Sequence, residues 1–137
     1  MQKQTNMIGK DKIVLLVEDD IDFKEQMEIL LKSFGFEVIS GESQAEGEEL
    51  LKKHKADLAI FDLMMENEDS GFILSNKSKR LYPDMPIIIA TSVAAETGMN
   101  FTVETEQDQN WLGANLILEK GIRPDQLHRE INKLLKL

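Results

Sequence analysis

Acidic residues directly follow two short apolar runs of this sequence. The run 58–61 (LAIF) ends on Asp62, and the run 12–17 (KIVLLV) ends on Glu18 and Asp19. Runs of this kind are typical of buried parallel strands, whose carboxyl ends meet at the ligand-binding edge of an open sheet. Three carboxylates at one edge repel each other unless a cation neutralises them, and a set of oxygen ligands suits Mg²⁺. The pattern therefore predicts a magnesium site, although an aspartate after a strand also commonly starts a turn.

Two more polar side chains fall at predicted strand ends. Thr91 ends the run 86–91 (PIIIAT), and Lys120 follows the run 115–119 (NLILE). A lysine at this edge would balance negative charge, and a threonine hydroxyl could bond an added oxyanion. Phosphoryl transfer to a carboxylate depends mainly on positioning and charge neutralisation, so the set suits that reaction. Asp62, in mid-sheet opposite the acid pair, is the candidate nucleophile.

The elements that must position these residues can be read from hydrophobic periodicity and capping signals. Apolar runs predict five strands, at 12–17, 36–40, 58–62, 86–91 and 115–119. Periodic segments predict five helices: from Asp22 to a stop at Gly35, from a Ser43–Glu46 capping box to about His54, about 71–81, a short one carrying Trp111, and a closing helix starting at Pro124. Their alternation predicts an α/β fold, a doubly wound five-stranded parallel sheet with helices on both faces.

Length and composition set the outer limits of the prediction. The 137 residues suit one domain, with a flexible N-terminal segment at 1–11 and the folded domain at 12–137. A net charge of -9 argues against nucleic-acid binding. The lack of cysteine excludes disulfides, a thiol nucleophile and a zinc–thiolate site. No apolar run approaches the ~20 residues needed to span a bilayer, so we expect a cytoplasmic protein without a membrane partner.

Four segments, in their order, carry a family resemblance: LLVEDD, ADLAIFD, PIIIATS and LILEK. With them the chain resembles the receiver domain of two-component response regulators, in the stand-alone, CheY-like form, with its flavodoxin-like fold. The resemblance implies that Asp62 is the phosphoacceptor and that Glu18 and Asp19 are the acid pair. In the family the Mg²⁺ ligands would be completed by Asp62 itself and by the backbone carbonyl of Met64. The resemblance also implies that Thr91 is the switch hydroxyl and that Lys120 contacts a phosphoryl oxygen.

The function implied is that of a single-domain response regulator. A histidine kinase or phosphotransfer protein would phosphorylate Asp62 in a Mg²⁺-dependent phosphorelay, and the product would signal by contact with a downstream protein. The chain would not be an enzyme, although it would assist its own phosphorylation and dephosphorylation. One alternative is a pseudo-receiver that is never phosphorylated. The other is an aspartyl phosphatase of the haloacid-dehalogenase type, but that class places a second acid where Met64 stands.

The sequence departs from the family pattern at four places. Gly121 replaces the usual proline after the lysine, and the aromatic switch position holds Ile117 or Leu118. The loop after Asp62 lacks the common proline and has one extra residue before Gly71. The segment 92–105 is unusually long and polar, and we hypothesise that phosphorylation reorders it. This interpretation needs neither of the two histidines, His54 and His128, and we expect both to be solvated.

Overall fold

The computed structural model describes residues 9–92 and 114–135 of the chain. Within them, five parallel strands form one sheet in the order β2-β1-β3-β4-β5. This order reverses direction between β1 and β3, which is the switch point of the flavodoxin-like arrangement. The predicted doubly wound sheet is confirmed, and its strands are β1 (Ile13–Val17), β2 (Glu37–Gly41), β3 (Leu58–Asp62), β4 (Ile87–Thr91) and β5 (Leu116–Glu119).

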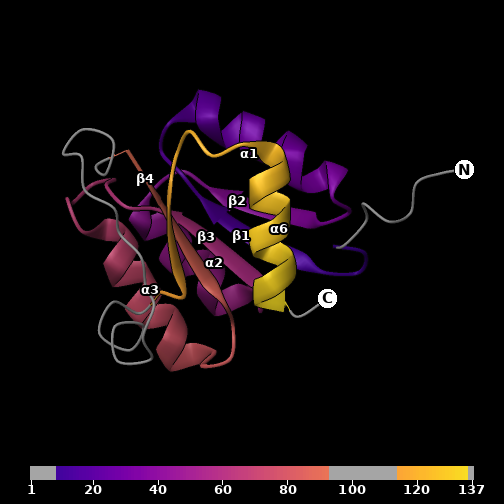
Figure 1. Ribbon diagram of the computed structural model, residues 1–137. Helices are drawn as coiled ribbons and strands as arrows, with labels where there is room; N and C mark the ends of the chain where they lie inside the picture. Colours follow the sequence, from indigo (N-terminus) through magenta and orange to yellow (C-terminus); the bar gives the residue numbers. More distant parts are fainter. Residues whose placement is uncertain (1–8, 93–113, 136–137) are drawn as a thin grey trace, which may run out of the picture.

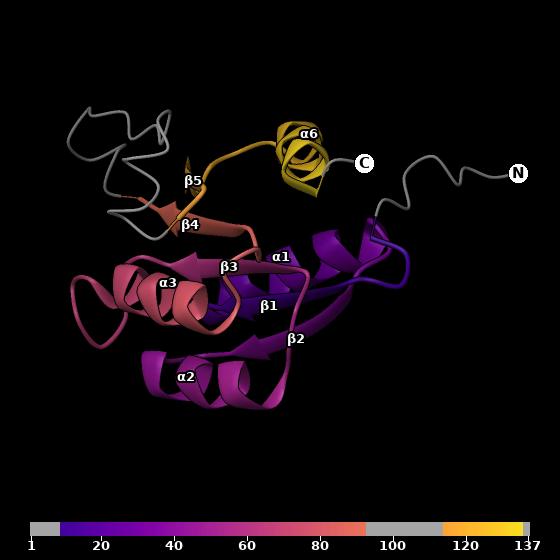
Figure 2. The ribbon, with the colours of Figure 1, turned by 90° about the horizontal axis from the view of Figure 1, so that it is seen from below.

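Helices cover both faces of the sheet, as Figure 1 shows. The described helices are α1 (Ile21–Ser33), α2 (Gln44–Lys53), α3 (Ser70–Leu81) and α6 (Pro124–Leu135). Alternate residues of each strand point to opposite faces. Leu15 and Val17 pack with Leu51 of α2 and Leu74 of α3, whereas the intervening positions of β1 pack against α1 and α6. Figure 2 shows the same layers from below, with α2 next to α3.

Local capping explains where the helices start and stop. The Ser43 hydroxyl accepts a hydrogen bond from the Glu46 N–H at 3.1 Å, and Gly35 follows α1 with φ 99°. Pro124 opens α6 as predicted. Asp20 is exposed and caps α1, because its Oδ1 accepts a hydrogen bond from the Phe23 N–H at 3.2 Å.

Three predictions concern segments that the structure covers in part or not at all. The short helix with Trp111 lies outside the described residues, and so does the segment 92–105 apart from Ser92. Of the N-terminal segment 1–11, residues 1–8 also lie outside them. Residues 9–11 form a turn whose Gly9 N–H donates to the Phe34 carbonyl at 2.9 Å. Among the described helices, none is both long and apolar enough to cross a membrane.

Candidate functional site

The sheet brings the predicted site residues to one edge. Asp62 and Thr91 are the last residues of β3 and β4, while Glu18 and Lys120 directly follow β1 and β5. The backbone hydrogen bonding of the sheet continues through them. The Glu18 N–H donates to the Gly41 carbonyl at 3.0 Å, and the Lys120 N–H donates to the Thr91 carbonyl at 2.9 Å. Their backbone positions are therefore held by the sheet itself rather than by mobile loops.

Three carboxylates converge at this edge. Glu18, Asp19 and Asp62 each place an oxygen within 4.8 Å of the others. Glu18 and Asp62 are buried, with 1% and 4% of their surface exposed, whereas Asp19 is exposed. The Lys120 ammonium lies 3.0 Å from Glu18 Oε2 and 3.1 Å from Asp62 Oδ1. One cation thus faces three acids, and the cluster retains excess negative charge when all three are ionised.

Desolvation and the neighbouring charges together perturb the titration of the cluster. Burial, followed by the neighbouring Glu18 carboxylate, raises the pKa of Asp62 to about 6. Although Asp19 is exposed, partial desolvation by the surrounding protein, followed by the neighbouring Asp62 carboxylate, raises the pKa of Asp19 to about 6. Burial lowers the pKa of the Lys120 ammonium, but its bonds to Glu18 and Asp62 outweigh this effect and the net pKa is raised. Lys120 therefore remains charged, and the two aspartates each hold a proton more readily than usual.

The donor set fits a hard divalent cation. Its groups are carboxylate oxygens, which Mg²⁺ prefers, and they lie close enough together to share one ion. A divalent charge would also offset the repulsion that, after desolvation, contributes to the raised pKa values of the two aspartates. The cluster could therefore bind a metal through its three acids, and Mg²⁺ is the metal that the donor chemistry favours.

The other two predicted residues also lie at this edge. Thr91 is buried at the end of β4. Met64 stands two residues beyond Asp62, in the loop 63–69, and the residue is 45% exposed. The roles of the Thr91 hydroxyl and of the Met64 carbonyl stay predictions.

Two residues that the sequence did not single out support this edge. The Phe23 ring on α1 lies under the Lys120 ammonium, with its centroid 5.1 Å from Nζ. Gly71 packs so closely that a Cβ there would fall 2.6 Å from the Asp62 carbonyl oxygen. In the sequence, Phe23 fits the apolar face of a helix, and Gly71 fits the start of another helix. Neither pattern indicates which strand end the residue contacts.

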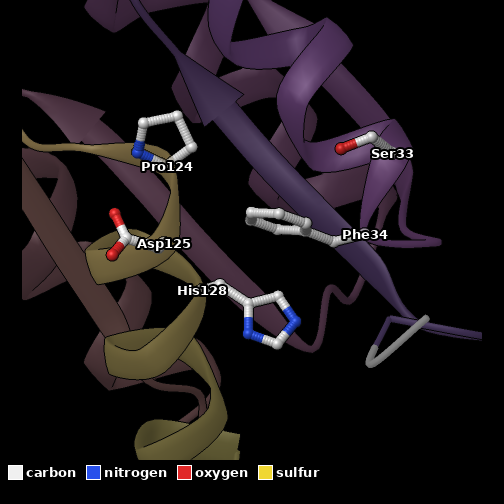
Figure 3. A pocket seen from close by; sticks show the side chains of 5 residues that line it. All are labelled: Ser33, Phe34, Pro124, Asp125 and His128. Atoms are coloured by element: carbon white, nitrogen blue, oxygen red, sulfur yellow. The ribbon is translucent and has the colours of Figure 1, made fainter. Parts of the chain in front are cut away.

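A separate pocket of about 410 Å³ lies between α1 and α6 (Figure 3). It is lined by Ser33 and Phe34 from the end of α1 and by Pro124, Asp125 and His128 from α6. Our prediction that His128 is solvated was wrong, because its ring packs edge-on against Phe34 with centroids 4.8 Å apart. Its Nε2 is buried and has no hydrogen-bond partner among the described residues. The pocket includes none of the residues of the acidic edge.

Comparison with protein families gives a match to the response regulator receiver domain over residues 14–132. Among curated proteins, the chain is 33% identical over 130 residues to the transcriptional regulatory protein GlrR of Escherichia coli K12. It is also 33% identical over 132 residues to the transcriptional regulatory protein GltR of Pseudomonas aeruginosa. Each alignment covers 95% of this chain, but only 28% of GlrR and 51% of GltR. Neither match tests the prediction that the protein is a stand-alone domain.

Solved structures share the fold. A CheY-like response regulator receiver domain protein from Methanospirillum hungatei JF-1 superposes with a TM-score of 0.75 at 24% identity, covering 91% of this chain and 94% of that one. A response regulator receiver protein from Sinorhizobium medicae WSM419 gives 0.69 at 23% identity, with coverage of 91% and 94%. At these identities the likeness concerns the fold alone.

Proposed function

This chain belongs to the response regulator receiver domains, and on that premise we propose that Asp62 accepts a phosphoryl group in a Mg²⁺-dependent relay. The observation that carries the proposal is the edge itself, where a buried aspartate lies 3.1 Å from a lysine and beside two further acids. This is the charge arrangement that phosphoryl transfer to a carboxylate requires. The donor would be a phosphohistidine of a histidine kinase or of a phosphotransfer protein.

The transfer itself exchanges one bond to phosphorus for another. An Asp62 carboxylate oxygen attacks the phosphorus, the bond between phosphorus and the donor imidazole nitrogen breaks, and the imidazole retains the electron pair. With a pKa of about 6, Asp62 is mostly ionised at pH 7.5, as a nucleophile must be. Bound Mg²⁺, held by Glu18, Asp19, Asp62 and the Met64 carbonyl, would neutralise charge on the transferred oxygens.

The remaining residues act on the acyl phosphate that forms. The Lys120 ammonium, which pairs with Asp62 here, would pair with a phosphoryl oxygen and offset the added charge. The Thr91 hydroxyl, at the end of the neighbouring strand, would donate a hydrogen bond to another phosphoryl oxygen. The same groups would position a water for hydrolysis, so the domain would assist its own dephosphorylation without being an enzyme toward other substrates.

The test is phosphorylation by a small acyl phosphate or amidophosphate with Mg²⁺. We expect intact-mass spectrometry to show one added phosphoryl group that hydroxylamine removes. Asp62→Asn should abolish the adduct, whereas Asp69→Asn, which changes an exposed acid of the adjoining loop, should keep it. A wild type that stays unlabelled would favour the pseudo-receiver, and continuous release of phosphate from many phosphomonoesters would favour the phosphatase. Labelling of the Asp62→Asn variant would show that another residue is the acceptor.

We further propose that signalling proceeds through contact with a downstream protein. The net charge of -9 supports the prediction that this chain makes no nucleic-acid contact of its own. GlrR and GltR are named transcriptional regulators, but this chain spans only part of each. DNA binding by those proteins is therefore not carried over to this chain.

A further inference from the structure

The side chain of Glu66 attaches the loop that follows the phosphoacceptor to the N-terminus of α2. Its Oε1 accepts a hydrogen bond from the Gln44 N–H at 2.6 Å, and its Oε2 accepts from the Ala45 N–H at 3.1 Å. These are the first two amides of α2, which have no acceptor within the helix. A carboxylate at this position also interacts favourably with the helix dipole.

A neighbouring side chain strengthens the same attachment. Asn67 Nδ2 donates to Gln44 Oε1 at 3.2 Å, and Gln44 Nε2 in turn donates to Glu48 Oε2 at 2.9 Å. Glu48 pairs with Lys77 of α3 at 2.9 Å. The middle of the loop is thus connected to α2, and through α2 to α3.

The two ends of the loop are held in a different way. The Leu63 N–H donates to the Ala90 carbonyl at 3.0 Å, and the Gly71 N–H donates to the Leu63 carbonyl at 2.7 Å. The Asn67 N–H donates to the hydroxyl of Ser70 at 3.0 Å. The first two bonds hold the loop where it leaves β3 and enters α3, and the third links Asn67 to the start of α3. The bonds from the middle of the loop to α2 come from Glu66 and its neighbour Asn67.

We propose that Glu66 is a positioning residue for the metal site, which it serves by holding the loop 63–69 against α2. The inference rests on the proposed function, in which the Met64 carbonyl binds Mg²⁺. Met64 is two residues from Glu66 and two from Asp62, so the bond pair at Glu66 restricts the backbone that carries this carbonyl. The sequence has no proline in this loop to restrict it covalently.

The experiment compares Mg²⁺ dissociation constants, measured by calorimetry at fixed pH and ionic strength. Glu66→Ala removes both acceptors. We expect it to weaken Mg²⁺ binding about three- to tenfold, which corresponds to losing one or two hydrogen bonds that order the loop. Glu66→Gln retains an amide oxygen that can accept one of the bonds, and we expect an intermediate loss.

Two control variants separate positioning from charge and from helix stability. Glu68→Ala removes the same charge from an exposed position of the same loop, and we expect its affinity to stay within twofold of the wild type. Ser43→Ala removes the other cap of α2 without touching the loop, so it should lower thermal stability but leave Mg²⁺ affinity unchanged.

The role of Glu66 can be overturned by the variants or by the wild type. If Glu66→Ala binds Mg²⁺ as the wild type does, or if Ser43→Ala loses as much affinity as Glu66→Ala, Glu66 only caps the helix and the inference is overturned. An equal loss in Glu68→Ala would assign the effect to charge and also overturn it. If the wild type binds no Mg²⁺, the metal site of the proposed function fails, and the role of Glu66 fails with it.

Discussion

The ammonium of Lys120 lies 3.1 Å from Oδ1 of Asp62, although β4 separates the two strands that carry them. The same nitrogen lies 3.0 Å from Glu18 Oε2, on the far side of Asp62 in the sheet. One lysine therefore spans the edge from β5 to β1 and is shared by two buried carboxylates. This sharing makes the stability of the domain depend on charge at a single point.

Replacing this lysine should destabilise the metal-free protein. Lys120→Met keeps much of the side-chain volume but leaves Glu18 and Asp62 without their cation, and we expect a loss of about 1–3 kcal/mol in the free energy of unfolding. Mg²⁺ should restore more stability in this variant than in the wild type, because the metal supplies the missing positive charge. Urea denaturation with and without Mg²⁺ measures both quantities. An equal Mg²⁺ effect in the two proteins would contradict the prediction.

The metal-free protein should become more stable as the pH falls from 7.5 to about 5. Asp19 and Asp62 have folded-state pKa values of about 6, above the ordinary value of 3.8 for an aspartate, so the folded state binds protons that the unfolded state does not. The gain should level off near pH 4, where the unfolded carboxyls also take up protons. Glu48 and Glu66 have lowered pKa values, so their opposing effect is confined to lower pH.

The control for this pH dependence is Asp62→Asn. This variant lacks the Asp62 carboxyl, and we expect most of the rise between pH 7.5 and 5 to disappear. Mg²⁺ affinity of the wild type should change in the opposite direction, falling as protons compete for the carboxylates. Denaturant midpoints measured in chelator across this range would refute the prediction if both proteins gave parallel curves.

Asp19→Asn should uncouple stability from Mg²⁺. The wild type should show a rise in melting temperature with millimolar Mg²⁺ by mass action, and the variant should lose most of it. Without metal, the melting temperature of the variant should be no lower than that of the wild type, because removing one of three acids reduces the electrostatic repulsion among them. Differential scanning calorimetry distinguishes this result from a variant that is simply less stable and still responds to Mg²⁺.

Gly71→Ala should displace the backbone of the phosphoacceptor Asp62. Its Cβ would fall 2.6 Å from the Asp62 carbonyl oxygen and 2.8 Å from the Leu63 Cα, so the end of β3 must move. We expect a stability loss of about 1–3 kcal/mol and slower labelling of Asp62 by a small phosphodonor.

The matched substitution is Gly121→Ala, for which a Cβ meets nothing within 4 Å. This variant should be neutral or slightly stabilised, since alanine has less conformational freedom in the unfolded chain. Labelling rates measured side by side test the pair, and equal rates would show that the close contact at Gly71 does not influence Asp62.

Much of the fold follows from local signals in the sequence. The strand of residues 58–62 was predicted with the bounds that the structure has, and Pro124 and Gly35 were placed correctly at helix ends. Other boundaries moved by about a residue, as for β2, which runs from Glu37 to Gly41 instead of from 36 to 40. The capping box differs in detail, because the Glu46 side chain accepts from the Glu42 N–H rather than from that of Ser43.

The sequence alone determined that Glu18, Asp19, Asp62, Thr91 and Lys120 would gather at one edge. It did so because parallel strands all end at the same edge, so any side chain that follows a buried apolar run must emerge there. Only the tertiary structure decided which of these groups touch, and which other residues hold them. Glu66 reaching α2, Phe23 lying under Lys120 and His128 turning onto Phe34 all join segments far apart in the chain. Such contacts depend on how loops close and how helices pack over the sheet, and no local periodicity encodes that geometry.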